Sequence, residues 1–522
     1  MNIPLLKSTA NLPRALARSC ATLVLTLSFH SSAQANDYVG TLTDPAFWSI
    51  SANWSGGLPV NGQNVTIGAF VPPNGGPNVL FDVTLTGSGL NSLTLNPVLA
   101  FIPATLNQVA PGTAMIAITE TIGTDFVATY NHVDGSNTAG TLIAGDLLGG
   151  VGTYNFSNGA LSGGAEFIGV SGTGVFNQIG GTNTVAGNLE IGSNSSGVGT
   201  YNLAAGTLSA AAEVIGNSGT GTFNQSGGTN LVSGSLTIAS NVGSVGTCNL
   251  SGGLLTVNGT GILNNGTINL TGTGILAGIG GMTNNGTVNF DGGTMAITGG
   301  VTNTSGAYIN VTAATTFSGA VTNNVGGIVK LTGTNVSWTA NFTNNGTYNT
   351  DPATNLFSDL TIGATGVFLG GVGDVISVSG NLLNQSTQNI AFDIDASLLV
   401  FDGAVTHQLT WPGADLGPDA AGYADNFAVG IFELASGAAL DFVSGALYVS
   451  VLDLDDGLAQ AASITGGGHI YYDPSAPENA YLAGGTYGGG IIAPVPEPGA
   501  SALLAGALLL GAWRRRRALR AV

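Results

Sequence analysis

Carboxylates are the side chains of this protein best suited to catalysis, and they are concentrated toward its carboxyl end. Sixteen of the 28 acidic residues lie within residues 351–478. Two suitably spaced carboxyl groups suffice to hydrolyse a glycosidic bond, which makes Asp393 with Asp395, or Asp455 with Asp456, a candidate catalytic pair. Aspartates this close together in turns more often bond their own loop, and we prefer that interpretation.

The same region invites a calcium interpretation, but its spacing is wrong for one. Asp453, Asp455 and Asp456 do not make an EF-hand loop, because the fifth position would be Gly457 instead of an oxygen ligand. The Gly-Gly-Val-Gly-Asp run at 370–374 misses the calcium-binding nonapeptide by one residue. We therefore expect no bound metal and no cofactor, and weak, charge-driven cation binding stays open.

A second set of carboxyl groups lies in the middle of the chain. Glu166, Glu190 and Glu213 fall in successive units of a repeat and could form a row for cations or for acid catalysis. Neighbouring repeats place Ile143 and Thr237 where Glu190 stands. A position that accepts Ile, Glu and Thr is typical of an outward-facing strand residue. Glu166 and Glu213 share a different place in the repeat, so we do not expect the three glutamates to form a functional row.

Basic side chains are scarce. Between residues 36 and 497 the chain has one basic residue, Lys330, and three histidines, His132, His407 and His469. A polysaccharide lyase needs a strong base and cations to hold an acidic sugar, which nearly excludes that class. No Ser-His-Asp arrangement, Gly-x-Ser-x-Gly elbow, His-Glu-x-x-His or phosphate-binding glycine loop is present. We expect the protein not to be an enzyme.

Composition excludes further classes of partner and fold. Charged residues make up 7% of the chain and hydrophobic residues 43%, with 84 glycines, so the chain is not typical of disorder. The 28 acidic residues and single lysine of residues 36–497 give 1 − 28 = −27. Nucleic acid is therefore an improbable partner, because phosphate binding depends on Lys and Arg.

An internal repeat organises the positions of these residues. A Gly-Thr-(Tyr/Cys)-Asn motif recurs every 47 residues, with a shifted copy ending in Phe-Asn-Gln between its occurrences. We call the residue directly before the Asn of each copy a rung. The rungs are Tyr130, Tyr154, Phe176, Tyr201, Phe223 and Cys248. His132 aligns with Gln178 and Gln225 two residues after a rung, which suggests a surface polar role for it. Farther on, Asn-Asn-Gly-Thr motifs continue the series at spacings near 20 residues.

Units of 19 to 25 residues, with short β-prone runs separated by Asn-Gly and Gly-Gly turns, indicate an all-β chain wound as a parallel β-helix. Equivalent residues of stacked coils lie about 4.8 Å apart, so like charges in register repel and few are tolerated. We expect the aromatic rungs to stack inward and the Asn after each rung to bond the next Asn. Cys248 stands on a rung and should be a buried apolar residue.

Beyond residue 35, this pattern divides the chain into four segments. Residues 36–129 precede the repeat register and are expected to form an N-terminal cap. The β-helix repeats occupy 130–350 and an acidic β-rich region 351–493. Residues 494–522 form a separate C-terminal segment.

The amino terminus has the layout of a secretory signal peptide in residues 1–35. Basic residues precede an uncharged run over 19–29, and a small-residue exit site follows at Ala33 and Ala35. We expect cleavage after Ala35 and export of the chain.

The carboxyl terminus carries Pro496, Glu497 and Pro498, then an apolar run over 500–513, then Arg514, Arg515, Arg516 and Arg517. An apolar helix followed by arginines is held with its basic end on the cytoplasmic side. These three parts in this order resemble a PEP-CTERM sorting signal. The resemblance covers about 28 residues. It implies processing at the Pro-Glu-Pro segment by an exosortase-type membrane protease, with the helix transiently in the inner membrane. A plain membrane anchor is the alternative.

The opening over 47–59 and the repeats themselves are similar to autotransporter-like β-helix proteins, although a sorting helix stands where an autotransporter has its membrane barrel. The secretion mechanism of that family is therefore not expected here. The expected function is that of a structural or adhesive protein at the outer cell surface or in the extracellular matrix, in contact with exopolysaccharide or biofilm material. A glycoside hydrolase with a carboxylate pair is the alternative.

Overall fold

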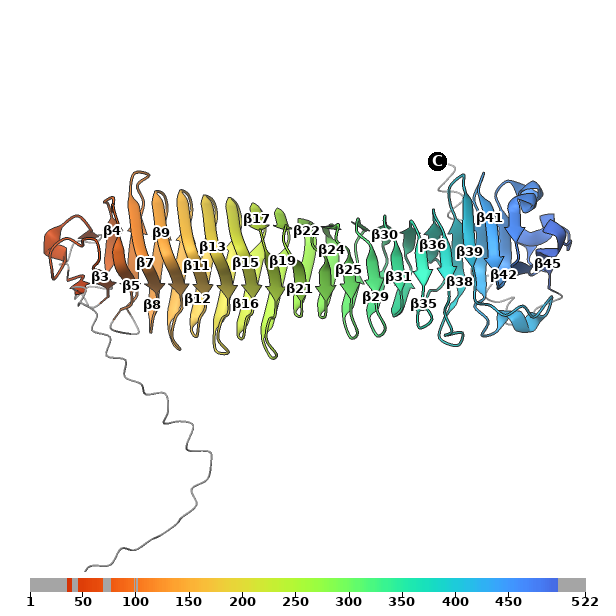
Figure 1. Cartoon of the computed structure of the whole chain (residues 1–522), viewed down its shortest axis with the longest axis horizontal. Coiled ribbons are helices and arrows are strands. Elements are labelled where there is room, and N and C mark those ends of the chain that lie inside the picture. Colours follow the sequence, from red (N-terminus) through yellow and green to blue (C-terminus); the bar gives the residue numbers. More distant parts are fainter. Residues whose placement is uncertain (1–34, 40–45, 69–76, 98, 100–101, 496–522) are drawn as a thin grey trace, which may run out of the picture.

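The computed structural model describes residues 35–39, 46–68, 77–97, 99 and 102–495. These residues form a parallel β-solenoid of about 18 turns, drawn as a long rod in Figure 1. At about 4.8 Å per turn, the stack is roughly 85 Å long. The all-β parallel β-helix predicted from the repeats is confirmed.

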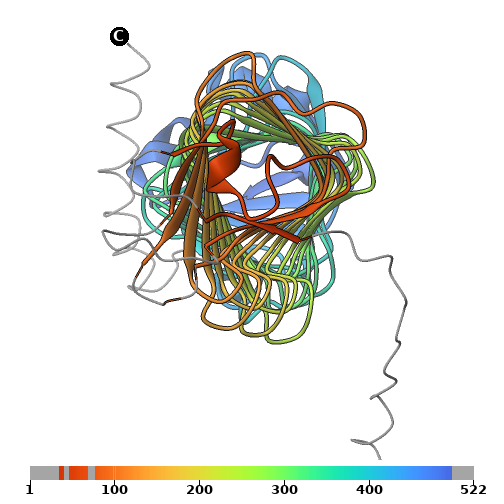
Figure 2. The same ribbon diagram turned by 90° about the vertical axis from the view of Figure 1, so that its left-hand side faces the viewer.

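Each coil has three faces, and viewed along the rod the coils superimpose around one interior (Figure 2). The first face consists of β2 (Ala46–Phe47), β4 (Asn78–Phe81), β6 (Ala104–Gln108), β8 (Val127–His132), β10 (Val151–Phe156), β12 (Thr173–Gln178), β14 (Val198–Leu203), β16 (Thr220–Gln225), β19 (Val245–Leu250), the first parts of β22 (Thr267–Gly278) and β24 (Thr287–Ile297), β26 (Tyr308–Val311), β29 (Ile328–Thr332), β32 (Thr347–Asp351) and β35 (Val367–Leu369).

The second and third faces are joined in the early coils by long bent strands. These are β7 (Ala114–Ile122), β9 (Ser136–Ala144), β11 (Ala160–Ile168), β13 (Thr182–Ile191) and β15 (Thr207–Ile215). After β15 the two faces have separate strands.

The second face continues, with the later parts of β22 and β24, in β17 (Thr229–Val232), β20 (Leu254–Val257), β27 (Thr315–Phe317), β30 (Asn335–Trp338), β33 (Thr354–Phe357), β36 (Val375–Val378), β38 (Ile394–Phe401), β40 (Val429–Leu434), β42 (Ala446–Leu454), β44 (His469–Tyr472) and β45 (Ile492–Pro494).

The third face begins with β1 (Ala35–Asp37), β3 (Asn64–Ile67) and β5 (Leu90–Leu95), and continues in β18 (Ser235–Ile238), β21 (Gly261–Asn264), β23 (Met282–Asn284), β25 (Val301–Asn303), β28 (Val321–Asn323), β31 (Phe342–Asn344), β34 (Leu360–Ile362), β37 (Leu382–Asn384), β39 (Thr406–Thr410), β41 (Ala439–Ser444) and β43 (Ile464–Gly466). Short 3₁₀ helices complete the described chain: η1 (Ser51–Asn53), η2 (Ala420–Tyr423), η3 (Gly457–Ser463), η4 (Pro477–Leu482) and η5 (Gly488–Gly490).

The parallel ladder crosses both boundaries expected from the sequence. Strand β6 pairs with β8 across residue 129, and β32 pairs with β35 across residue 350. The first face then narrows to a single bridge between Leu369 and Asp393, while the other two faces continue. The coils therefore change shape in the region where acidic residues become frequent.

The repeated motif is explained by its position on the first face. Glycine is required before the Thr of the motif because a Cβ on Gly199 would lie 2.0 Å from the carbonyl oxygen of Ile168. The aromatic rungs are fully buried, and the rings of Tyr154, Phe176 and Tyr201 stack at centroid distances of 4.9 and 4.5 Å. The predicted inward stack is confirmed, and so is the burial of Cys248 on the last rung.

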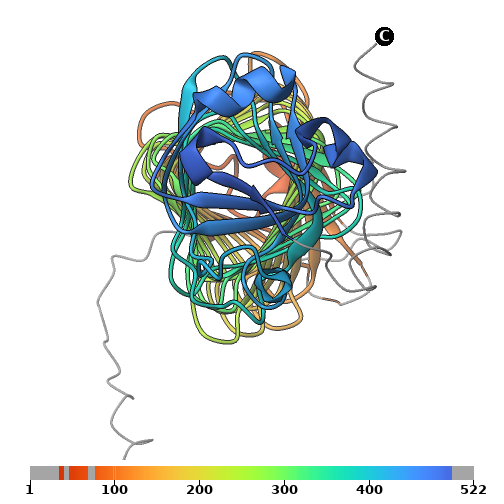
Figure 3. The same cartoon turned by 90° about the vertical axis from the view of Figure 1, so that its right-hand side faces the viewer.

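The carboxyl-terminal end covers an open strand edge, which would otherwise be a template for aggregation. Strand β44 pairs only with residues 446–449 of β42. Beyond them, Asn479 Oδ1 accepts from the Leu452 N–H at 3.0 Å, and the Tyr481 hydroxyl accepts from the Leu454 N–H at 3.2 Å. The 3₁₀ helix η4, drawn in blue at the near end in Figure 3, thus substitutes for a neighbouring strand.

Candidate functional site

The outward residues of the first face form a regular neutral array. Each of its middle strands presents a Thr and, two residues later, an Asn, with the apolar rung pointing inward between them. From β6 to β24 the outward Thr column is interrupted once, by Val175. Its threonines are Thr105, Thr129, Thr153, Thr200, Thr222, Thr247, Thr267 and Thr287.

The Asn column beside them is bonded along the rod. From Asn131 to Asn310 each side-chain Nδ2 donates to Oδ1 of the Asn one coil before, at 2.7–2.9 Å. This confirms the predicted amide ladder. Lys330 occupies the next place in the column, where the ladder ends. Because one N–H of each amide is used within the ladder, the side chains are fixed and leave a repeated polar pattern facing outward.

The interior holds polar groups of a different kind. Glu120, Glu166 and Glu213 are 0–1% exposed. Loss of hydration on burial raises the pKa of Glu120 and Glu213 to about 7 and the pKa of Glu166 to about 8, from an ordinary value of 4.5. Each accepts one hydrogen bond from an Asn 17 residues later in the chain, on the strand that pairs with its own.

Glu190, which was expected to face outward, does so and is partly exposed, whereas Glu166 and Glu213 face inward. The physical reason is a bulge in β13, between Val185 and Asn188, that adds one residue. Side chains alternate sides along a strand, so Glu190 falls one residue out of phase with the other two and points outward.

The surface role expected for His132 is wrong. Its alignment with the glutamines is correct, but that column faces inward and His132 is fully buried. Burial lowers its pKa to about 4. Its Nδ1 lies 2.9 Å from the Tyr154 hydroxyl and its Nε2 lies 3.3 Å from the Gly135 carbonyl oxygen.

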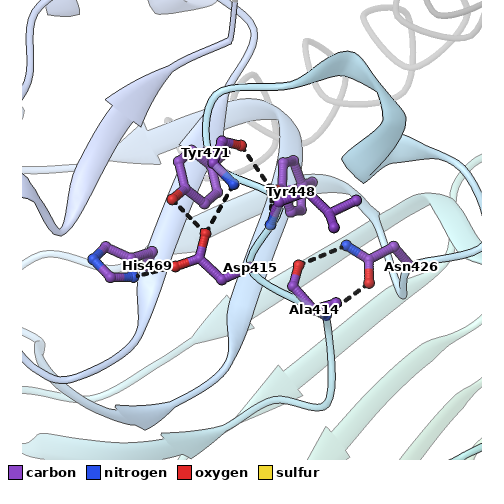
Figure 4. Close-up of polar contacts among 8 residues, drawn as sticks. Ala414, Asp415, Asn426, Tyr448, His469 and Tyr471 are labelled. Carbon is purple, nitrogen blue, oxygen red and sulfur yellow. Dashed lines mark hydrogen bonds and ion pairs between the residues drawn. The ribbon is translucent and has the colours of Figure 1, made fainter.

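A group of polar side chains comes together on the acidic C-terminal part of the second face (Figure 4). Asp415, in the loop before η2, lies 3.0 Å from His469 Nδ1 and accepts from the Tyr471 hydroxyl at 2.6 Å. That hydrogen bond lowers the pKa of Asp415. The loop itself is fixed to the strand by Tyr448, whose hydroxyl donates to the Gly417 carbonyl and accepts from the Leu416 N–H. The arrangement anchors the loop, and it also presents a partly exposed imidazole beside a carboxylate.

A pocket of about 350 Å³ lies where the end of β42 meets η4. Asp453, Asp455 and Glu478 contribute to its lining together with Tyr481. Carboxyl groups beside an aromatic ring are the lining expected of a carbohydrate site. Sequence reasoning included Asp453 and Asp455 but missed Glu478, which comes from η4 and has no motif.

The other candidate carboxyl groups have structural roles. Asp456 accepts from the Ser436 hydroxyl and the Gly437 N–H, at 2.6 and 2.7 Å. Asp374 accepts from Thr350 and from the backbone N–H groups of Ala353 and Gly371. Asp456 thus bonds a turn of the coil before its own, and Asp374 bonds both its own turn and residues of the coil before.

Asp393 and Asp395 are both exposed on either side of a buried residue, and proximity to Asp393 adds to the burial that raises the pKa of Asp395. Within the described part of the chain, no three His, Cys, Asp or Glu side chains are grouped so that they could hold a metal ion.

The residues assigned to sorting lie outside the described residues. These are Ala33, Pro496, Glu497, Pro498 and Arg514–Arg517, with the apolar run of 500–513. Ala35 is described as the first residue of β1. Among the described residues, no helix is long and apolar enough to cross a membrane. The solenoid itself continues to Val495, whose N–H donates to the Tyr472 carbonyl at 2.9 Å.

No protein-family model, no curated protein and no solved structure matches the chain. Its function is therefore inferred from the geometry described above.

Proposed function

We propose that this protein is an exported structural or adhesive rod that contacts neutral exopolysaccharide through the first face of its solenoid. The observation that carries the proposal is the Asn ladder beside the Thr column, which repeats one polar pattern from β8 to β24 with Val175 as its single interruption. A catalytic site needs one place that differs from the others, whereas a repeating polymer needs many that are alike.

The charge of the body supports a neutral partner. The outward Thr and Asn columns from β6 to β19 contain no charged side chain, and Lys330 is the only basic residue between 36 and 497. An acidic polymer would find few cations to pair with. Hydroxyl and amide groups suit the hydroxyl groups of uncharged sugars, because both sides donate and accept hydrogen bonds.

Delivery to the cell surface is part of the same proposal. The signal peptide of 1–35 directs export, and an exosortase-type membrane protease processes the chain at Pro496, Glu497 and Pro498 after the helix has held it in the inner membrane. The extent of the folded body supports this proposal. Its last paired residue is Val495, and the sorting segment follows directly after it in the chain.

Intact-mass measurement of the protein recovered from the cell envelope and the medium tests delivery. The proposal expects a mature chain that begins at Asn36 and ends within residues 496–499. A membrane-bound chain that retains Arg514–Arg517 would reduce the C-terminal segment to a plain anchor.

Binding by the first face is tested by one substitution on each of two faces. Thr200→Glu places a charge in the neutral array, and Thr322→Glu places the same charge on the outward side of the third face. Co-sedimentation with the neutral exopolysaccharide of the producing cells should weaken for Thr200→Glu and stay unchanged for Thr322→Glu. Equal loss, or no loss, in both variants contradicts binding through the first face.

The second candidate function is a carbohydrate-active hydrolase, and the pocket beside β42 is the observation that favours it. Asp455 and Glu478 would act as the carboxyl pair, with Tyr481 at the wall of the pocket. Release of reducing ends from neutral polysaccharides by the wild-type protein, abolished in Asp455→Asn and in Glu478→Gln, would establish this function. No release by the wild type leaves the structural role.

A further inference from the structure

The buried glutamates belong to a column of the solenoid in which polar and apolar residues alternate. In successive coils the column reads Glu120, Leu142, Glu166, Leu189 and Glu213. Each carboxyl group is thus separated from the next by a coil that carries leucine. The spacing prevents direct contact between carboxyl groups, and it repeats at 46 and 47 residues, the period of the sequence.

An asparagine column accompanies it at the same period. Asn137, Asn183 and Asn230 are 0–1% exposed and alternate with leucines in the same way. Their Nδ2 atoms donate to Oε2 of Glu120, Glu166 and Glu213, at 2.8, 3.1 and 3.1 Å respectively. The result is three carboxyl–amide pairs, in alternate coils.

Each pair leaves two buried acceptor atoms without a partner. These are Oε1 of the glutamate and Oδ1 of the asparagine, in all three pairs. Buried polar atoms are nearly always hydrogen-bonded, and an ionised carboxylate can only accept. A protonated carboxyl group has the missing donor. Its O–H can donate to the asparagine Oδ1 while its other oxygen accepts from the same amide, so both orphan atoms are satisfied at once.

In the part of the chain that the structure describes, no positively charged group lies beside these carboxyl groups to stabilise their ionised form. The titratable groups that face the carboxyl groups are Tyr130 and Tyr154 beside Glu120, Tyr154 and Tyr201 beside Glu166, and Tyr201 and Cys248 beside Glu213, together with the other glutamates of the row. Burial raises the pKa of each of these tyrosines and of Cys248, so all of them are neutral. His132 lies behind the Tyr154 hydroxyl and is also neutral at pH 7, because burial lowers its pKa.

We infer that Glu120, Glu166 and Glu213 are protonated in the folded protein and that each forms a cyclic acid–amide pair with its asparagine, so that the coils from β7 to β17 are stabilised at acidic pH and weakened at alkaline pH. This property of the interior is independent of what the outer faces bind.

The direction of the pH dependence follows from linkage. In the unfolded chain these glutamates ionise near pH 4.5, whereas burial shifts their folded pKa values to about 7 to 8. The stabilisation is therefore fully present below pH 4.5 and is lost as the pH rises through 7 to 8. Between these limits, each glutamate raises the ratio of unfolded to folded protein about tenfold for every pH unit.

The test compares the full-length wild-type chain with the triple variant Glu120→Gln, Glu166→Gln and Glu213→Gln. Glutamine has the shape of the protonated acid and can make both hydrogen bonds, but it does not ionise. Urea unfolding from pH 5 to 8.5, with amide hydrogen exchange corrected for intrinsic rates, gives the stability of β7–β17. Glu190→Gln is the matched control, because Glu190 lies in the same coils and is partly exposed.

We expect the wild type and Glu190→Gln to lose exchange protection in β7–β17 by at least 100-fold between pH 5 and 7, with the coils from β28 to β34 much less affected. The triple variant should keep the protection of pH 5 at both values. Infrared spectroscopy at pH 6 should show a protonated-carboxyl stretching band that the triple variant lacks.

Three results would overturn the inference. The first is a triple variant with the same pH dependence as the wild type. The second is absence of the infrared band at pH 6. The third is a cation that stays bound in native mass spectrometry of the wild type and is lost in the triple variant, because a cation would then satisfy the orphan oxygens.

Discussion

Removing the hydroxyl group of Tyr201 tests whether the interior polar groups are bonded as the structure shows. This hydroxyl donates to Gln178 Oε1 at 2.6 Å and accepts from Asn183 Nδ2 at 3.1 Å. Tyr201→Phe deletes one oxygen atom and keeps the ring. The ring fits, because Phe176 and Phe223 occupy the same column in the adjacent coils.

The expected cost follows from the partners that remain. Gln178 Oε1 loses its donor, and one N–H of Asn183 loses its acceptor, although Asn183 still donates to Glu166. A buried polar group without a partner costs about 1–3 kcal/mol. Because two groups lose their partners, we expect Tyr201→Phe to lower the free energy of unfolding of these coils by about 2–6 kcal/mol, with little contribution from burial of the ring.

Coil-resolved hydrogen exchange under native conditions is the appropriate assay, because a solenoid opens locally and its unfolding need not be two-state. Tyr308→Phe is the control, since Tyr308 is 42% exposed and faces outward, and it should change stability by less than about 0.5 kcal/mol. If Tyr201→Phe were as mild as this control, the interior hydrogen bonds could not have the geometry described.

Three further predictions concern other parts of the rod. Gly199→Ala should destabilise the coils around β14 by several kcal/mol in urea unfolding, because the added Cβ meets backbone atoms that cannot move aside; wild-type stability would show that the coils can separate. Cys248 should react with maleimide only in denaturant, since it is buried and burial raises its thiol pKa; rapid labelling of the native protein would contradict this. Asp415 has a lowered pKa, so its stabilisation is present above its unfolded pKa and lost as the pH falls through its folded value. Exchange protection of residues 411–428 should decline below about pH 4 in the wild type, and Asp415→Asn should remove that decline.

Much of the fold follows from the repeat. A motif that recurs at a fixed period, in a chain with almost no charge, places equivalent residues above one another. The aromatic rungs, the outer Asn ladder and the burial of Cys248 were all predicted from that argument, and the structure confirms them.

The candidate interior residues were harder to predict. Glu166 and Glu213 share one place in the repeat and Glu190 another, but the repeat does not show which place faces inward, because a single bulge residue reverses the side of the strand on which a side chain lies. Glu120 was missed because it precedes the residues assigned to the repeat. The spacing of 17 residues from each buried glutamate to its asparagine is a signal that the sequence does contain.

The contacts of the C-terminal region had no such signal. Asp415 and Tyr471 are 56 residues apart, and the loop that carries Asp415 belongs to no repeat. Glu478 reaches the pocket from a 3₁₀ helix that substitutes for a missing strand. Pairings of this kind depend on how irregular segments fold back over the last coils.

The sequence by itself determined that the chain is a β-solenoid, which residues form its columns and where charge is excluded, because stacking multiplies the effect of each repeated residue. Only the tertiary structure decided which columns face inward, since the alternation of a strand is reset by every bulge and corner. That decision placed three glutamates in the interior as buried acids, and it separated the pH-sensitive interior of the rod from its neutral outer face.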